Sequence, residues 1–242
     1  IKTCDLTPKQ GTSMATPLVA GDTALVRQYF TEGFYPTGTK STVNAQKPTG
    51  ALIKALIVNG ARVVNNQENL GQPLKRGATP VAPGTKGLPD TVQGHGIVTL
   101  THSMMFQNAA DGFSMHVLAG FCPSAGGVAG GAVPRNSVLV DGNSCSRQDV
   151  LNMEHVTNGV AKPYPPVEIK PNSQLGVNVT LAWSDAPGTL GNRGPALVNN
   201  LDLVVTDNLG KTYLPTKPST GTRQVEDRDT VEKVIINPAE LV

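Results

Sequence analysis

The sequence predicts a protein of two unlike parts, a helical part over residues 1–110 and an all-β part over residues 111–242. Two segments before residue 60 repeat apolar residues at three- and four-residue steps, which is the period of an α-helix. After residue 110 the apolar residues alternate in short runs between turn signals, which is the period of a β-strand. The 26 Gly and 19 Pro residues predict many loops without forming the tracts typical of disorder.

The first predicted helix covers residues 13–30. Pro17 is tolerated there because it lies in the first turn, where its missing N–H removes no helical hydrogen bond. Gly33 and Pro36 end this helix. The apolar positions that define it are Met14, Leu18, Val19, Ala20, Leu25 and Val26.

The second predicted helix covers residues 51–58, opened by the segment 48–50 and ended by Gly60. Residues 65–94 form a long Gly/Pro-rich stretch without periodicity, which predicts a loop. Residues 94–100 close this first part of the chain.

Six strands are predicted in the second part, and together they favour a β-sandwich. Alternation is clearest in residues 177–183 and 201–205, and residues 208–210 form a turn between two strands. The predicted strands are 114–118, 137–140, 176–183, 197–206, 211–214 and 230–236.

Composition excludes two classes of partner. The formal charge of +2 and the lack of Lys/Arg clusters with interleaved aromatic residues argue against nucleic acid. No apolar run approaches the roughly 20 residues that a membrane span requires.

The cysteines and the one glycosylation sequon leave their alternatives open. Cys122 and Cys145 could close a loop and leave Cys4 for another partner, or all three could be free thiols. None has the C-x-x-C spacing of a zinc or redox site. The sequon at Asn178 is compatible with secretion, but such triplets also occur by chance.

Ser13 is the candidate nucleophile, because it stands at the start of a helix between small residues. A helix N-terminus offers free N–H groups and a positive dipole end, which favour the oxyanion formed when a serine attacks a carbonyl. Gly11, Thr12 and Ala15 would let a substrate backbone approach closely. The alternative is an ordinary N-cap serine, which a lone serine before an apolar helix would be in most cases.

The eleven residues from Gly11 to Gly21, GTSMATPLVAG, resemble the nucleophile signature of the subtilisin-like serine proteases, G-T-S-M-A-x-P-x-V-A-G. Every fixed position of that signature is matched. The resemblance implies that Ser13 is the catalytic nucleophile, that its backbone N–H belongs to the oxyanion hole, and that Gly11 and Thr12 adjoin the substrate. It also implies an α/β subtilisin-like catalytic domain, of which this chain would hold the C-terminal portion.

Later segments are similar to one branch of this family, the oxidatively stable alkaline subtilisins, which carry a C-terminal jelly-roll β-sandwich. The helix 52–57 and the segment 94–98 are similar to the end of a subtilase catalytic domain, whereas residues 111–171 match poorly. The branch segments are LAWSDAP at 181–187, LVNNLDL at 197–203 and TVEKV at 230–234.

Two departures from the family limit what the chain can do alone. Asn200 stands where the branch usually has the first Asp of L-V-N-D-L-D-L. Nothing matches the D-[ST]-G and H-G-T-H segments that supply the Asp and His of the triad, nor the segment of the oxyanion-hole Asn. We therefore expect a piece of a subtilase with an incomplete sandwich, and apolar faces left exposed on both helices.

Other side chains invite functional assignments. His95 lies in a Gly-His-Gly segment, but its place corresponds to a variable position of the family, so we expect a structural or exposed histidine. His102, His116 and His155 have no partner at metal-ligand spacing. Trp183, the single tryptophan, is expected to be a core anchor rather than a sugar platform.

Calcium is the one metal that the resemblance raises. Four acidic residues lie in or near predicted loops of the sandwich, where the branch commonly carries structural calcium. No EF-hand spacing exists, and ordinary turn carboxylates are the preferred interpretation for each of them. These residues are Asp202, Asp207, Asp227 and Asp229.

The leading functional hypothesis is a secreted serine endopeptidase that cleaves protein or peptide substrates through an acyl-enzyme on Ser13, without a cofactor in the chemistry. It requires an upstream part of the catalytic domain. The alternative is a non-catalytic fragment whose β-sandwich contacts proteins or carbohydrates.

Overall fold

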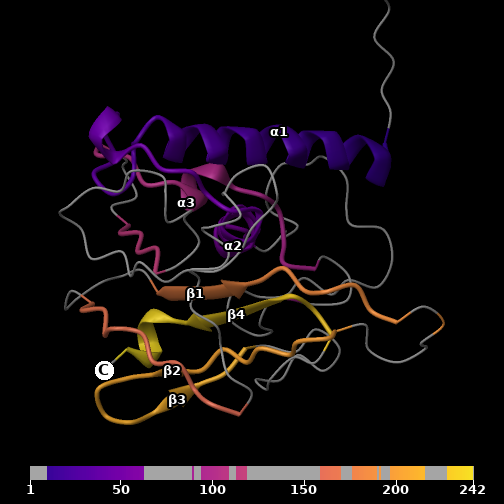
Figure 1. The fold of residues 1–242 in the computed structure, drawn as a ribbon. Coiled ribbons are helices and arrows are strands. Elements are labelled where there is room, and N and C mark those ends of the chain that lie inside the picture. The colour runs from indigo at the N-terminus through magenta and orange to yellow at the C-terminus, as the bar shows by residue number, and fades with distance from the viewer. Residues whose placement is uncertain are drawn as a thin grey trace, which may run out of the picture.

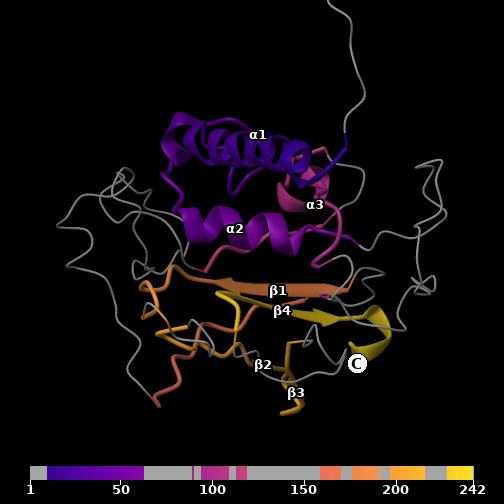
Figure 2. The ribbon, with the colours of Figure 1, turned by 90° about the vertical axis from the view of Figure 1, so that its right-hand side faces the viewer.

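The computed structural model describes residues 10–62, 89, 94–108, 113–118, 159–169, 176–189, 191, 197–215 and 228–241. Figure 1 shows these residues in layers, with helix α1 (Thr12–Thr31) outermost, then α2 (Gly50–Asn59) and the short α3 (Leu100–Ser103), and the strands beneath. α1 runs across the view in Figure 1 and α2 does so in Figure 2, so the two helices cross. None of the helices in these ranges has the length and apolar character needed to cross a membrane.

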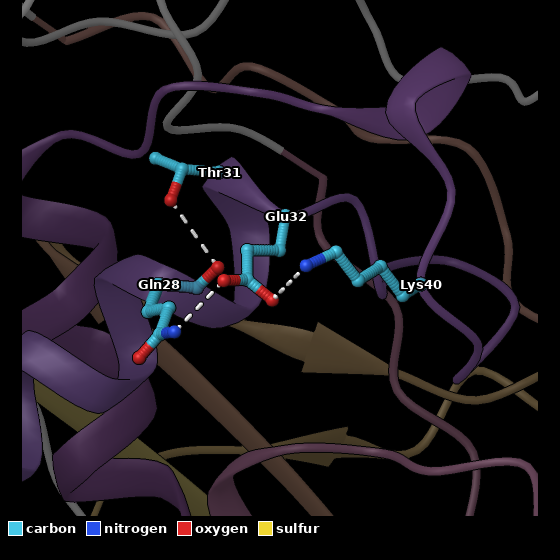
Figure 3. A network of polar contacts seen from close by, with 4 residues as sticks. All are labelled: Gln28, Thr31, Glu32 and Lys40. Carbon is cyan, nitrogen blue, oxygen red and sulfur yellow. Dashed lines mark hydrogen bonds and ion pairs between the residues drawn. The ribbon is translucent and has the colours of Figure 1, made fainter.

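Helix α1 begins one residue before the predicted start, with Gly11 as its N-cap. Pro17 is therefore the sixth residue of the helix, and the prediction that it lies in the first turn is wrong. It ends in the network of Figure 3, in which Glu32 lies between two partners. Gln28 Nε2 donates to Glu32 Oε1 over 2.8 Å, and Lys40 Nζ lies 2.9 Å from Glu32 Oε2. The bond from Gln28 and then the contact with Lys40 lower the pKa of Glu32. The network joins the end of α1 to the following loop.

Helix α2 begins at a side-chain cap. Thr49 is fully buried, and its Oγ1 accepts a hydrogen bond of 3.1 Å from the N–H of Leu52. This bond satisfies one of the N–H groups that the first turn of a helix leaves without an intrahelical acceptor.

Replacing Thr49 by alanine is expected to lower the free energy of unfolding by about 1 kcal/mol, because the N–H of Leu52 loses its acceptor. Urea denaturation followed by circular dichroism measures the change. Thr49→Ser, which keeps the hydroxyl, is the matched control, and an equal loss in both variants would contradict the capping role.

The helices enclose an aromatic core. Phe30 of α1 is 1% exposed, and its ring lies 5.1 Å from that of Tyr29 and 5.7 Å from that of Tyr35, centroid to centroid. Tyr29 Oη donates to the carbonyl of Met105 over 2.7 Å, and burial raises the pKa of Tyr29 to about 12. The buried members of this core are Val26, Tyr29, Phe30, Tyr35, Leu52, Leu56, Ile57, Met104 and Val117.

Two antiparallel sheets of two strands each lie below the helices. β1 (Val177–Ala182) pairs with β4 (Val231–Ile236), with Val179 opposite Val234. β2 (Val205–Thr206) pairs with β3 (Thr212–Tyr213). The two short 3₁₀ helices are η1 (Thr42–Asn44) and η2 (Pro238–Glu240).

The β1–β4 sheet is covered on both faces. Val177, Val179, Val234 and Ile236 pack with Tyr213 of β3 in a second apolar core. The opposite face of the sheet lies against α2, which packs on β1 and β4 (Figure 2). Five of the six residues of β4 are consequently buried.

The structure confirms both predicted helices and the predicted strands 176–183, 211–214 and 230–236, which are β1, β3 and β4. β3 is shorter than predicted. The prediction of a strand at 114–118 is wrong, because the N–H of Val117 donates to Tyr35 Oη over 3.1 Å and Val117 packs into the helical core. Most of the predicted strand 197–206 is also irregular, and only β2 remains of it. The strand 137–140 and almost all of the loop 65–94 lie outside the described residues.

The expectation of exposed apolar faces is confirmed for α1 and wrong for α2. On α1, Met14 is 41%, Leu18 72% and Leu25 49% exposed. On α2, the apolar residues Leu52 and Leu56 are buried, because the helix has α1 on one side and the sheet on the other. The described strands form two sheets of two strands each, which is fewer than a jelly roll contains. The jelly roll therefore stays a prediction.

Candidate active site

Ser13 is the second residue of α1 and is exposed. It is not the N-cap, since that position belongs to Gly11 and no side chain caps the helix. The carbonyl of Gly11 accepts from the N–H groups of Met14 and Ala15, over 3.0 and 3.1 Å. Among the described residues, the N–H groups of Thr12 and Ser13 are left without a partner, which is the usual state of a first turn.

The backbone at Gly11 explains one fixed position of the motif. Its φ of 144° lies in a region that residues with a Cβ rarely adopt. A Cβ there would meet only Met14 Sδ, at 3.8 Å, so the requirement for glycine is conformational and not steric. The chain therefore reaches Ser13 through a bend that leaves the serine and the first N–H groups uncovered.

Ser13 has no general base in the described part of the chain. No histidine there forms a hydrogen bond with it. His95 interacts instead with Lys233 and Asp229 at the junction of α2 and β4. Burial lowers the pKa of His95, the charge of Lys233 lowers it further, and Asp229 acts in the opposite sense. Within the described part of the chain, its buried Nδ1 has no hydrogen-bond partner.

Met14 follows the candidate nucleophile Ser13 and is accessible to oxidants, with 41% of its surface exposed. Peroxide treatment is expected to slow acylation of Ser13 in the assembled protease, because a sulfoxide oxygen would stand beside the reactive hydroxyl. Labelling of Ser13 by a fluorophosphonate, with Met14 oxidation verified by mass spectrometry, measures this. Met14→Leu is the control, which cannot form the sulfoxide, and an unchanged labelling rate after oxidation would contradict the expectation.

Of the acidic residues considered for calcium, Asp207 is used by a turn. Asp207 Oδ1 accepts from the N–H groups of Leu209 and Lys211, both over 2.9 Å, and Oδ2 accepts from Tyr213 Oη over 3.2 Å. Asp202 and Asp229 are exposed. Within the described ranges no three His, Cys, Asp or Glu residues gather as a metal site would require, and Asp227 lies outside them.

Asp185 is an organising residue that the sequence did not single out. It accepts four hydrogen bonds, among them one of 2.6 Å from the N–H of Val198 and one of 2.8 Å from Asn199 Nδ2. Desolvation acts to raise its pKa, but these bonds lower it overall. Trp183 is 5% exposed and donates to the carbonyl of Asn199 over 3.1 Å, which confirms it as a core anchor.

Several predicted residues cannot be placed. Cys4, Cys122, Cys145 and His155 lie outside the described residues. His102 lies in the last turn of α3 and His116 in the segment 113–118.

Comparison with known proteins agrees with the motif. Residues 4–96 match the subtilase family profile, described as "Subtilase family". The chain is 26% identical over 235 residues to "Serine protease/ABC transporter B family protein tagB" of Dictyostelium discoideum, and 28% identical over 246 residues to tagD of the same organism.

The two relatives match almost all of this chain but only a small part of their own length. The matches cover 94% and 96% of the chain, β-strands included, but only 12% of either relative, so the chain spans about an eighth of their length. No solved structure matches the chain significantly. Residues 4–96 are thus similar to the subtilase family, and both relatives are named as serine proteases.

Proposed function

We propose that the chain is part of a subtilisin-like serine endopeptidase in which Ser13 is the nucleophile. The observation that carries this proposal is the position of the motif serine in the first turn of α1, exposed and beside two N–H groups that have no partner in the described part. An ordinary N-cap serine would stand at the position of Gly11, and its hydroxyl would accept a hydrogen bond from an N–H of the first turn. Ser13 lies two residues later, and its side chain does not cap the helix.

The chemistry would be acyl transfer. Ser13 Oγ would attack the carbonyl carbon of the scissile peptide bond, while its proton passes to a histidine base, and expulsion of the amine would leave an ester on Ser13. Water would then hydrolyse the ester. The N–H of Ser13 and the positive end of the α1 dipole would stabilise the oxyanion, with Gly11 and Thr12 beside the substrate backbone. The reaction requires no metal or cofactor in this mechanism.

The His and Asp of the triad would come from sequence outside this chain. The exposed stripe of Met14, Leu18 and Leu25 supports this, because an apolar stripe along a helix is typical of a face that packs against other structure. The remaining catalytic domain would cover the stripe and bring the base to Ser13. We also propose that the substrates are proteins or peptides and that the protein is secreted. The β1–β4 sheet would belong to a complete jelly roll, and structural calcium would bind outside the turn at Asp207.

A fluorophosphonate probe applied to the full protein that contains this chain tests the proposal. We expect one covalent adduct, which mass spectrometry of tryptic peptides should locate on Ser13, and no adduct after substitution Ser13→Ala. The isolated chain is expected to label far more slowly, because it lacks the base. Absence of any adduct in the full protein would favour the non-catalytic alternative.

A further inference from the structure

The side chain of Lys233 in β4 is buried at the C-terminal end of α2, with 1% of its surface exposed. Its Nζ donates to the carbonyls of Val58, Asn59 and Ala61, over 3.0, 2.9 and 3.3 Å. An ammonium group has three N–H donors, so these three carbonyls use all of them.

The C-terminal carbonyls of α2 are capped by a side chain of β4 and not by one of the helix itself. The last carbonyls of a helix have no intrahelical donor, so an N–H donor from elsewhere in the chain is needed when they are buried. The last turn of α2 contains no basic residue. Lys233, more than 170 positions further along the chain, takes that place.

Other hydrogen bonds join α2 to β1 and to the segment just before β4. Asn59 Nδ2 donates to the carbonyl of Asn178 over 3.1 Å and to Thr180 Oγ1 over 3.0 Å, both in β1. Lys54 Nζ donates to Thr230 Oγ1 over 2.7 Å, just before β4. Figure 2 shows α2 lying along the sheet at this junction.

We propose that Lys233 is a positioning residue, which caps α2 from β4 and so makes the β1–β4 sheet the support of the helix pair that carries Ser13. The link continues to α1 through the shared core, where Leu52 and Leu56 of α2 pack with Val26 and Phe30 of α1. The role of Ser13 in this statement rests on the proposed function, whereas the coupling of sheet and helices does not.

The coupling can be measured without enzymatic activity. Urea unfolding is followed by circular dichroism at a helix band and by the fluorescence of Trp183, the single tryptophan. The backbone N–H of Trp183 donates to the carbonyl of Thr230, just before β4, and its indole N–H donates to the carbonyl of Asn199. We expect coincident transitions in the unmodified chain and separate ones in Lys233→Met, with the helices unfolding at lower urea. Lys233→Arg should restore coincidence at least in part, because a guanidinium can still donate to the carbonyls.

The exposed Lys47 supplies the matched control, and Lys47→Met should leave both transitions in place. Coincident transitions in Lys233→Met, or separate ones in the unmodified chain, would overturn the proposal. Should Lys233→Met fail to fold, Lys233→Gln replaces it, since the amide keeps polarity but has two N–H donors in place of three and no charge. The same two outcomes then decide.

A pH series gives a second, independent readout. Burial lowers the pKa of Lys233 to about 8, below the roughly 10.4 of an unfolded lysine. Between these values the unfolded chain binds more protons, so the contribution of Lys233 to stability rises from about pH 8 to about pH 10.5. The unmodified chain should gain in urea midpoint over this range relative to Lys233→Met. The other titratable groups at the junction, Lys54, His95 and Asp229, are retained in both, and parallel pH profiles would overturn the buried cap.

Discussion

Replacing Ser13 by alanine is expected to lower kcat of the assembled protease by about 10⁶-fold, the size of this effect in subtilisin itself. The physical reason is that the acyl-enzyme cannot form, while substrate binding and the oxyanion contacts of the first turn of α1 persist. Residual activity above the uncatalysed rate would come from those contacts. Hydrolysis of a chromogenic peptide by the full protein measures the loss.

Ser184→Ala is the matched control, because Ser184 is also exposed but stands in the β part of the chain. It is expected to leave kcat and KM unchanged. A Ser13→Ala variant that keeps its peptidase activity would remove Ser13 from the mechanism. A loss of equal size in Ser184→Ala would mean that the assay reports folding instead of chemistry.

Replacing Phe30 by alanine is expected to lower the free energy of unfolding by about 3–5 kcal/mol, because the deletion leaves a cavity at the centre of the helical core. The ring is 1% exposed and contacts those of Tyr29 and Tyr35. Urea denaturation of the chain, followed by circular dichroism, measures the change.

Phe106→Ala deletes the same atoms at a site that is 40% exposed, next to the ring of Tyr29. We expect less than half of the loss found for Phe30→Ala, since less surface returns to water and no closed cavity remains. Equal losses in the two variants would contradict the assignment of Phe30 to the core centre.

The helices could be predicted from the sequence because their signals are local. The period of the apolar residues and the cap at Thr49 each act within one helix. The prediction of a strand at 114–118 is wrong because the contacts that decide its conformation are distant in the sequence. Its alternation has the period of a strand, but Tyr35, far away in the sequence, takes the N–H of Val117 and the helical core takes its side chain.

The candidate nucleophile could be found because its motif is contiguous, whereas Lys233 could not. A lysine in a six-residue strand ordinarily faces solvent, and nothing nearby in the sequence indicates the carbonyls that it binds. The same holds for the burial of α2. Its neighbours on one side belong to β1, more than 110 residues later in the chain.

The two buried ionisable residues of β4 also determine how this strand can pair. Glu232 lies opposite Leu181 and accepts a hydrogen bond from the N–H of Leu203, whereas its neighbour Lys233 faces α2. A slip by one residue would exchange the two faces. The carboxylate would then meet the carbonyls at the negative end of α2, and the ammonium would enter the apolar core around Tyr213. Adjacent opposite charges therefore reject the misaligned pairings that the apolar residues of the strand alone would tolerate.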